Sequence, residues 1–187
     1  MKKHVAGLIL TCCVPVFLLG GCCRLCHRER AVKEQAETRA DQAQAAAVAA
    51  HKEVIIDSEG PAADLERKGD WPPGLGGSDW KDGCLFAFKG NGECKFIWRP
   101  DLPADGHYRV SIWFGGDPNS DHATNSPFTV VYDGGREKHE IDQTRDSGGW
   151  KVLGTYPFQA GRAGCVELTN EANGNVVADA VRFESLR

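Results

Sequence analysis

The chain has 187 residues, 41% of them hydrophobic, with 22 glycines and 9 prolines. This composition is typical of one globular domain with accessory segments, and the glycine content favours turns over long helices. The formal net charge of −4 at pH 7 gives no electrostatic attraction for nucleic acid, so we expect no nucleic-acid partner.

The cysteines are unevenly distributed. Of the 8 in the chain, only Cys84, Cys94 and Cys165 lie beyond residue 26. This crowding at the N-terminus indicates processing chemistry there rather than a disulfide framework. A bridge between two of the three later cysteines would leave the third unpaired, and the sequence leaves open which two would pair.

Residues 1–21 have the features of a secretory signal peptide. Two lysines at positions 2 and 3 precede an apolar run over 5–19, which is too short to span a membrane as a helix. The run ends in Leu19-Gly20-Gly21-Cys22, which resembles the lipobox of bacterial lipoproteins. We therefore predict that Cys22 is lipidated, with an ordinary signal peptide cleaved nearby as the alternative. The resemblance implies attachment to the cell envelope, and to the outer membrane if the cell has two membranes.

A second motif overlaps the lipobox. Cys23-Arg24-Leu25-Cys26-His27 fits the pattern of c-type haem attachment. Met1 is the only methionine, and no cytochrome-like helical pattern surrounds the site. We therefore expect no haem, and we interpret the segment as a cysteine-rich, membrane-proximal end.

Residues 29–52 are rich in alanine and charged helix formers and contain neither glycine nor proline. A helix over this run would be about 36 Å long at ~1.5 Å per residue. We therefore predict that residues 22–52 form a lipidated N-terminus and a helical linker. The apolar stripe of this helix is mostly alanine, so a monomeric helix is favoured over a coiled-coil dimer.

From residue 53 onward the pattern changes to short runs of alternating polar and apolar residues, which are typical of β-strands. The predicted strands cover 54–57, 64–69, 85–88, 93–98, 108–114, 128–132, 138–141, 148–158, 164–170 and 176–183. Glycine-rich turns at 90–92 and 133–135 favour hairpins. The fold class we predict is therefore all-β, a jelly-roll β-sandwich over 53–187.

Several motifs in this region carry a family resemblance. They are Val54–Asp57, Trp98–Pro103, Gly106–Val110, Ala123–Pro127, Gly149–Trp150 and Val177–Phe183. In this order they resemble the golvesin and xanthan lyase C-terminal carbohydrate-binding-like domain, over nearly all of residues 53–187. The resemblance implies a jelly-roll β-sandwich that binds polysaccharide. Two departures are the lipid-anchor motif without a catalytic partner in the sequence, and a segment over 71–81 rich in Gly, Pro and Trp.

Tryptophans are the first candidates for sugar contact, because an exposed indole can cover the apolar face of a sugar ring. Trp113 is predicted to point outward from strand 108–114, with coverage by a neighbouring loop as the alternative. Trp71 and Trp80 lie in the Gly- and Pro-rich segment, where either exposure or burial is possible. Trp98 and Trp150 share strand faces with apolar residues, so we expect them in the core.

The polar loop 115–127 offers further candidates. Asp117, Asn119, His122 and Asn125 could contact sugar hydroxyls, although Asn125 is favoured to hydrogen-bond its own loop instead. The sequence contains no nucleophile elbow and no zincin motif, and its carboxylates show no spacing that picks out a glycosidase pair. We therefore expect a protein that is not an enzyme.

Asp179 is predicted to point inward, because it shares a strand face with Val177 and Val181. A buried carboxylate needs partners. We favour backbone N–H groups of the loop beside the first strand, and the alternative is a Ca²⁺ ion shared with Asp57. No other metal or cofactor is expected.

Three functions remain open from the sequence. The first is a lipid-anchored envelope protein with a non-catalytic polysaccharide-binding module. The second is a structural or protein-interaction envelope lipoprotein, and the third is a carbohydrate-active hydrolase. Exposed aromatic residues at one face or loop end would favour the first, an apolar surface patch the second, and a cleft with converging carboxylates the third.

Overall fold

The computed structural model describes residues 28–30, 32–40, 53–75, 77–81, 83–116 and 121–186. The predictions for Cys22, Asp117 and Asn119 lie outside these residues. The chain divides into two compact units, Met1–Ala47 and Val48–Arg187. In the first unit, residues 28–30 and 32–40 are helical and exposed, and they fall within the predicted linker. Among the described residues, no helix is long and apolar enough to cross a membrane.

The second unit is built from short strands, which confirms the prediction of an all-β fold. The strands are β1 (Glu53–Asp57), β2 (Leu65–Lys68), β3 (Leu85–Ala87), β4 (Lys95–Trp98), β5 (Gly106–Trp113), β6 (Ser126–Tyr132), β7 (Gly135–Ile141), β8 (Lys151–Phe158), β9 (Cys165–Thr169), β10 (Val176–Ala178) and β11 (Ala180–Leu186), with a short 3₁₀ helix at Ala62–Asp64.

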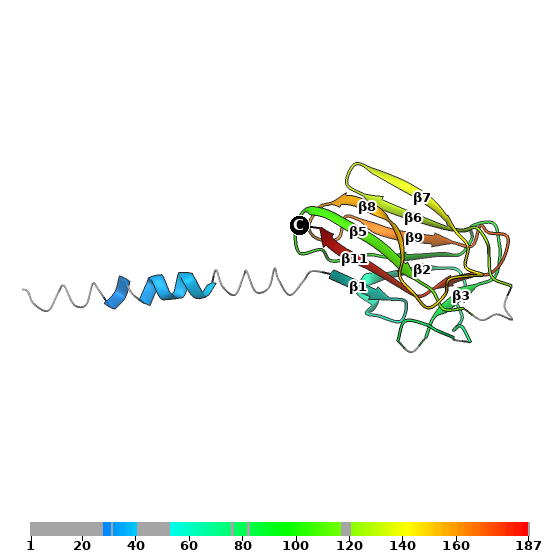
Figure 1. The fold of residues 1–187 in the computed structure, drawn as a ribbon, viewed down its shortest axis with the longest axis horizontal. Helices are drawn as coiled ribbons and strands as arrows, with labels where there is room; N and C mark the ends of the chain where they lie inside the picture. Colours follow the sequence, from blue (N-terminus) through cyan, green and yellow to red (C-terminus); the bar gives the residue numbers. More distant parts are fainter. Residues whose placement is uncertain are drawn as a thin grey trace, which may run out of the picture. The chain divides into compact units, whose positions relative to one another are not determined.

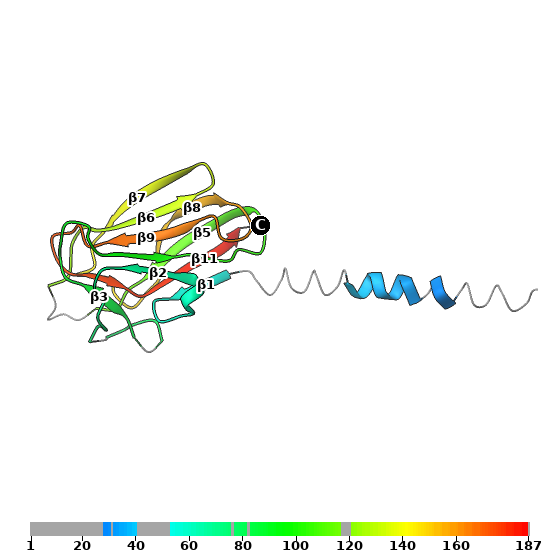
Figure 2. The same ribbon diagram turned by 180° about the vertical axis from the view of Figure 1, so that it is seen from behind.

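These strands form a β-sandwich (Figure 1). One sheet has the order β1-β11-β5-β8 and the other β2-β4-β9-β6-β7, while β10 and β3 form a separate pair. Neighbouring strands run antiparallel. In both ribbon views β3 lies at one end of the sandwich, and the C-terminal end of β11 lies at the opposite end (Figures 1 and 2).

The run 176–183, predicted as one strand, is divided at Asp179. Its first part, β10, pairs with β3, and its second part, β11, pairs with β1 and β5. Asp179 is buried between them, with only 1% of its surface exposed, which confirms that it points inward. The chain thus passes from the small strand pair to the four-stranded sheet at a buried carboxylate.

The prediction that Trp150 lies in the core is wrong. The register between β5 and β8 shifts between residues 110 and 111, so that Leu153 is an extra residue on β8. A bulge of this kind reverses which face the following side chains occupy. Tyr156 and Phe158 are therefore buried, whereas Val152 is 56% exposed and Trp150 is half-buried on the outer face.

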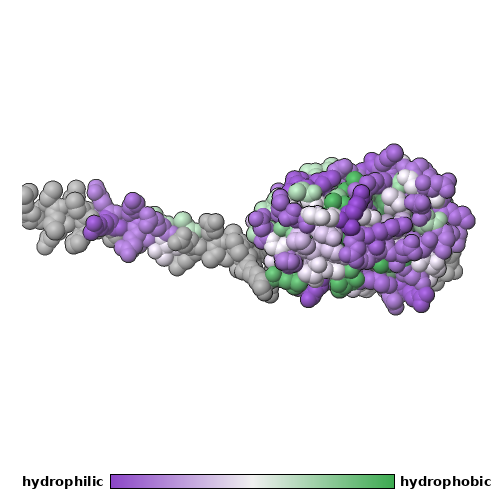
Figure 3. Space-filling model, turned by 90° about the horizontal axis from the view of Figure 1, so that it is seen from above, coloured by the Kyte–Doolittle hydropathy of each residue, from purple (hydrophilic) through white to green (hydrophobic). Residues whose placement is uncertain are grey.

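The visible face of the domain in Figure 3 is mostly hydrophilic, with small hydrophobic areas. Ion pairs such as Arg136–Glu167 and Lys95–Glu167, both 2.8 Å, cover the outer face of the five-stranded sheet. Leu75 and Phe88 depart from this pattern, because they are large apolar side chains that are 93% and 63% exposed. Both lie near β3.

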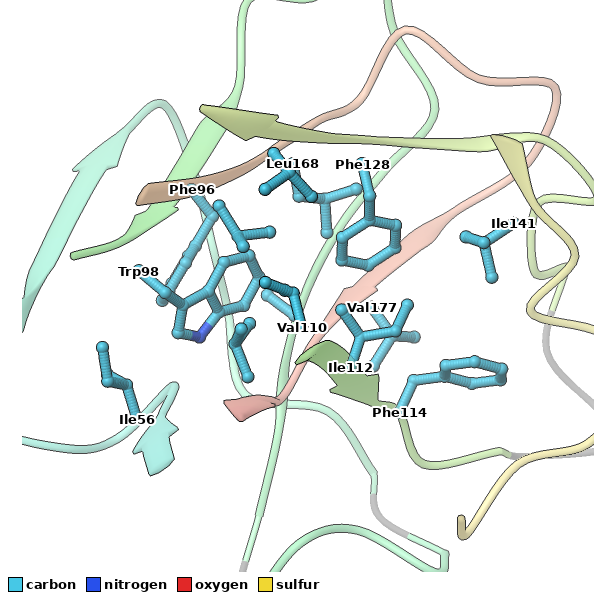
Figure 4. Close-up of a cluster of buried hydrophobic side chains, with 14 of the residues drawn as sticks. Ile56, Phe96, Trp98, Val110, Ile112, Phe114, Phe128, Ile141, Leu168 and Val177 are labelled. Carbon is cyan, nitrogen blue, oxygen red and sulfur yellow. The ribbon is translucent and has the colours of Figure 1, made fainter. Parts of the chain in front are cut away.

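The core lies between the two large sheets, where side chains from both meet (Figure 4). The five-stranded sheet contributes Phe96, Trp98 and Phe128, and the four-stranded sheet contributes Val110 and Ile112, all at most 1% exposed. The ring of Trp98 stacks on Phe128 at 6.3 Å, which confirms its predicted place in the core.

Cys84, Cys94 and Cys165 are buried, and in the described part of the chain none of them forms a disulfide. The expectation of a bridged pair is therefore not met. Cys94 and Cys165 come from separate parts of the five-stranded sheet region, and Cys84 immediately precedes β3. Burial raises the pKa of the Cys165 thiol, which keeps it protonated and unreactive.

Candidate functional site

A cavity of about 190 Å³ opens at the β3 end of the sandwich, and we call it the loop-end cavity. Five separate segments of the chain contribute to it. Its lining residues are Gly74, Leu75, Asp79, Cys84, Phe86, Phe88, Gly115, Gly116, His122, Asn175 and Val177. Concave, largely apolar sites with a few polar groups are where small ligands bind most often.

The floor of the cavity is one face of the β3–β10 pair. Side chains alternate along β3, so that Leu85 and Ala87 are buried while Phe86 and Phe88 point the other way. Phe86 lies opposite Val177 in the register, and both residues line the cavity. The rings of Phe86 and Phe88 meet edge to face at 5.1 Å, which gives the floor an aromatic side.

One wall comes from the loop 69–84, which folds back along β3. The N–H of Gly74 donates to the carbonyl oxygen of Cys84 at 2.8 Å, and Phe86 N–H donates to Pro72 at 3.0 Å. A Cβ atom at Gly74 would collide with the Cys84 sulfur, so only glycine allows this close approach. The exposed Leu75 follows directly and stands at the rim.

Asp79 stands on the same wall, on a backbone that bends sharply. Ser78 and Lys81 have φ values of 66° and 58°, in the left-handed region that non-glycine residues rarely adopt. Gly115 lies against the Asp79 carboxylate, where a Cβ would collide with Oδ1. This Oδ1 is buried and has no hydrogen-bond partner among the described residues. A buried acceptor without a partner is rare in folded proteins, which singles out Asp79 on this wall.

The polar side of the cavity is fixed by Gln143, which is 1% exposed. Its Oε1 accepts from the N–H of Val177 at 2.9 Å and from the hydroxyl of Ser126 at 2.7 Å, while its Nε2 donates to the Val177 carbonyl at 2.9 Å. The carbonyl oxygen of Gln143 accepts from Nδ1 of His122 at 3.2 Å. Because that oxygen can only accept, Nδ1 carries the proton and Nε2 is left as the acceptor of the neutral ring.

His122 also lies beside Asn175 through a parallel bridge between the two residues. The backbone N–H of Ala123 donates to the Asn175 carbonyl at 2.9 Å, and that of Asn175 donates to Asp121 at 2.7 Å. The side-chain oxygen of Asn175 accepts from the Lys89 N–H at 3.2 Å. Its amide NH₂ is the group that remains to donate to a ligand.

Two of the tryptophans predicted as sugar platforms, Trp80 and Trp113, form a cluster with Trp150 instead. Trp80, Trp113 and Trp150 contact one another with ring centroids 4.8–5.5 Å apart. The Arg182 guanidinium lies 4.6 Å above the Trp150 ring, and Nε1 of Trp113 donates to the carbonyl oxygen of Ser78 at 2.8 Å. Trp113 is therefore half-buried under loop 77–81, as in the alternative interpretation, and it supports the wall that carries Asp79.

The remaining candidates have structural contacts. Trp71 is 7% exposed, packs edge-on against Phe96 at 5.2 Å and donates from Nε1 to the Lys68 carbonyl at 3.0 Å, so it is a core residue and not a sugar platform. Asn125 accepts from the N–H of Asn173 at 2.9 Å. It therefore tethers the neighbouring loop, rather than its own. Of the polar candidates described, His122 alone lines the cavity.

Asp179 lies behind the cavity wall. The backbone N–H of Trp80 donates to its Oδ2 at 3.1 Å, so a backbone partner is present, although it comes from the loop 69–84 rather than the loop beside the first strand. Burial raises the pKa of Asp179 to about 8, and the charges of Asp79 and Asp57 act in the same direction. The carboxyl is therefore mostly protonated at neutral pH.

The described residues do not fit a calcium site. Among them no group of three His, Cys, Asp or Glu side chains could hold a metal ion. One oxygen of Asp57 accepts from the Glu59 N–H at 3.0 Å, and the other lies 4.0 Å from the Lys81 ammonium. Ca²⁺ takes about six to eight oxygen ligands, and two carboxylates with other partners fall well short of that number.

The carboxylates of the cavity lining bear on the hydrolase alternative. Asp79 is the one carboxylate among the described lining residues, whereas glycoside hydrolysis needs two opposed carboxyl groups. Sequence reasoning missed Asp79, Phe86, Phe88 and Gln143. The alternation of Phe with Leu and Ala over 85–88 is the signal that could have identified the two phenylalanines.

Comparisons with known proteins agree with this fold. Residues 54–185 match the family model of the Golvesin C-terminal domain. A xanthan lyase of Bacillus sp. (strain GL1) is 31% identical over 137 residues, which cover 70% of this chain and 14% of that protein. The chain thus spans only a small part of this relative.

Two solved structures are also similar. A Paenibacillus xanthan lyase matches with a TM-score of 0.67 and 30% identity, over 73% of this chain and 13% of that one. A family 35 carbohydrate binding module from Clostridium thermocellum matches with a TM-score of 0.51 and 13% identity, over 71% and 98% respectively, which shows a shared fold. The domain thus shares a β-sandwich fold with that module, and the chain belongs to the Golvesin C-terminal domain family.

Proposed function

We propose that this chain is a lipid-anchored protein of the cell envelope whose β-sandwich binds polysaccharide without catalysing a reaction. The lipid is on Cys22, and the membrane is the outer one in a cell with two membranes. The observation that carries the binding proposal is the loop-end cavity, which is lined by aromatic side chains together with Asp79, His122 and Asn175. The family membership and the fold of the relatives support it.

The cavity combines the two kinds of contact that a sugar needs. Water satisfies sugar hydroxyls as well as a protein does, so net affinity comes largely from burying C–H faces against apolar side chains. Phe88 is 63% exposed and Leu75 is 93% exposed, so both have surface to bury on binding. Full burial of one such side chain contributes roughly 1.5–3 kcal/mol, which gives affinities nearer millimolar than nanomolar.

A mutational comparison tests the proposal. The full-length protein, solubilised in detergent, is passed over a panel of immobilised polysaccharides. Phe88→Ala should abolish retention without lowering Tm, because the side chain is mostly exposed. Val152→Ala is the matched control, since Val152 is 56% exposed on β8, away from the cavity lining, and should leave retention unchanged. Equal retention of both variants would contradict a role for the cavity.

The Trp113→Ala variant distinguishes glycan binding at the cavity from binding at the Trp113 surface, which the sequence predicts. Because Trp113 packs against two other tryptophans and holds Ser78, its loss should lower the free energy of unfolding by about 2 kcal/mol. A thermal melt measures this. If Trp113→Ala removed retention with Tm unchanged, the indole itself would be the sugar platform.

The second candidate, a protein-interaction role, is favoured by the same two exposed apolar side chains, because such surface also fits a protein partner. The two functions differ in the competitor that displaces the partner. Soluble oligosaccharide should block the cavity if it binds glycans, and should leave a protein complex intact.

A further inference from the structure

We propose that the loop-end cavity receives a single uncharged sugar unit at the end of a glycan chain and discriminates against acidic sugars. This inference rests on the proposed function and adds the class of ligand. It is drawn from the size of the cavity and from the polar groups and the charge of its lining.

The size of the cavity limits the ligand to one unit. The volume of about 190 Å³ is below the roughly 300–1,000 Å³ of pockets for drug-sized ligands. The described lining comes from five segments, in the loop before β3, in β3, at residues 115–116, at residue 122 and at residues 175–177. A cavity of this size holds about one sugar ring, whereas an extended chain needs a longer groove.

The Asp79 carboxylate is the acceptor that would hold the hydroxyl edge of that unit. Asp79 is one of the lining residues, and its Oδ1, which lies against Gly115, is buried without a hydrogen-bond partner among the described residues. Neighbouring hydroxyls on a pyranose ring are donors at a spacing that suits the two oxygens of a carboxylate. Hydrogen bonds to an ionised group are about twice as strong as neutral ones, so Asp79 can orient the sugar.

The other polar groups complete the hydroxyl side. Nε2 of His122 is an acceptor because Nδ1 donates to Gln143, and the Asn175 amide has its NH₂ left to donate. Phe86 and Phe88 also line the cavity, and their rings suit the C–H face of a sugar ring. A single unit therefore meets acceptors, a donor and apolar surface in one cavity.

The charge of the lining discriminates against acidic sugars. The described lining residues include the carboxylate of Asp79 and neither lysine nor arginine. A uronate would bring a second carboxylate close to Asp79, and no described lining residue offers a cation to pair with it. Two like charges at 4 Å repel by about 4 kcal/mol at an effective dielectric constant of 20. If solvent screens most of this repulsion, the part that is left still weakens binding by about tenfold.

The test uses the full-length protein in detergent and sugars that differ only in charge. Methyl glycosides of glucose, galactose and mannose are compared with the corresponding 6-carboxylates and with the methyl esters of those carboxylates. Competition against a glycan array that displays neutral and uronate chain ends gives the affinities. We expect at least one neutral glycoside to compete, its ester to bind similarly, and its carboxylate to bind at least about tenfold more weakly.

Two further measurements connect the discrimination to Asp79. Asp79→Asn keeps the shape of the side chain and should reduce the difference between ester and carboxylate to less than about threefold. Asp101→Asn, which removes an exposed carboxylate outside the cavity lining, should leave that difference unchanged. In the unaltered protein the difference should also shrink as salt rises from about 0.05 to 0.5 M, because screening weakens the repulsion.

The outcomes distinguish this inference from the proposed function. If no glycan on the array is retained, both are overturned. If glycans bind but affinity rises with each added internal unit, or uronates bind as well as their esters, this inference is overturned while the binding function stands. If salt leaves the ester–carboxylate difference unchanged, discrimination by charge is overturned.

Discussion

Asp179 is a buried carboxyl group at the junction between β10 and β11. Its backbone carbonyl accepts from the indole Nε1 of Trp98 at 3.2 Å, and its Oδ2 accepts from the Trp80 N–H, so the residue connects the core to the wall of the loop-end cavity. Oδ1 has no partner among the described residues. A protonated carboxyl is suited to this position, because the neutral form loses less solvation on burial.

The stability of the domain should therefore depend on pH. The pKa of Asp179 is raised from its ordinary value of 3.8 to about 8, so between these values the unfolded chain binds fewer protons than the folded one. The contribution of Asp179 to stability is then full below about pH 4 and is lost progressively as the pH rises to about 8. Asp179→Asn removes the ionisation and keeps an acceptor for Trp80.

Thermal melts should show the variant close to the unaltered protein in Tm at about pH 4 and increasingly more stable as the pH rises to 8. Asp101→Asn is the control, since Asp101 is exposed, and it should give a constant difference. Parallel curves for Asp179→Asn and the unaltered protein would contradict the raised pKa. Because a calcium ion would need the ionised carboxylate, a chelator that lowered Tm would contradict this account as well.

At the scale of elements, the chain is organised around Gln143, which joins the loop after β7 to β10 and β6. Its amide pairs with both backbone groups of Val177 and with Ser126, all of them buried. β10 has only three residues, so these side-chain bonds supplement its short ladder with β3. The position of the cavity floor thus depends on one amide.

Gln143→Met should test that dependence. Methionine has a similar length but cannot pair with Val177, and each buried backbone group left unsatisfied costs about 1–3 kcal/mol. We expect a loss of about 3 kcal/mol in the free energy of unfolding, measured in denaturant. Gln159→Met is the control, because Gln159 is exposed and should tolerate the change. A loss below about 1 kcal/mol would show that β10 is held by its strand pairing alone.

The sequence was sufficient to predict most of the strands and the alternation of polar and apolar residues along them, because that alternation is a local pattern. It placed Trp98 in the core and Asp179 inward, and both are buried. It failed for Trp150, because a bulge on β8 changes the face of the strand without a local signal. It also could not bring Asp79 to Gly115, because that contact depends on how two distant loops meet.

Candidate residues were harder to predict than strands for the same reason. Phe86 and Phe88 carry the alternation of a strand that is covered on one face, yet the sequence does not tell whether the other face meets solvent, a loop or a ligand. Trp71 illustrates the converse, because its Gly- and Pro-rich surroundings are typical of an exposed loop, while the ring packs against Phe96. Burial in loops depends on tertiary contacts that periodicity does not encode.

At the scale of the whole molecule, membrane attachment would change how a weak binding site performs. A site with millimolar affinity holds a glycan only briefly, but many copies on one surface engage a repeating polysaccharide together and gain avidity. A module that recognises chain ends needs such display, because each chain presents few ends. The proposed anchor at Cys22 would therefore be as important to the proposed function as the cavity itself.

The last prediction concerns that anchor. One acyl chain gives only marginal membrane binding, with an association constant of about 10⁴ M⁻¹, so stable attachment requires the several chains that lipoprotein processing adds to one cysteine. Cys22→Ala should therefore move the protein from the membrane fraction to the soluble fraction and abolish incorporation of labelled fatty acid. Cys23→Ala is the neighbouring control and should leave both unchanged. If the alanine variant at position 22 still incorporated label and stayed with the membrane, another residue would carry the lipid and the lipobox assignment would be wrong.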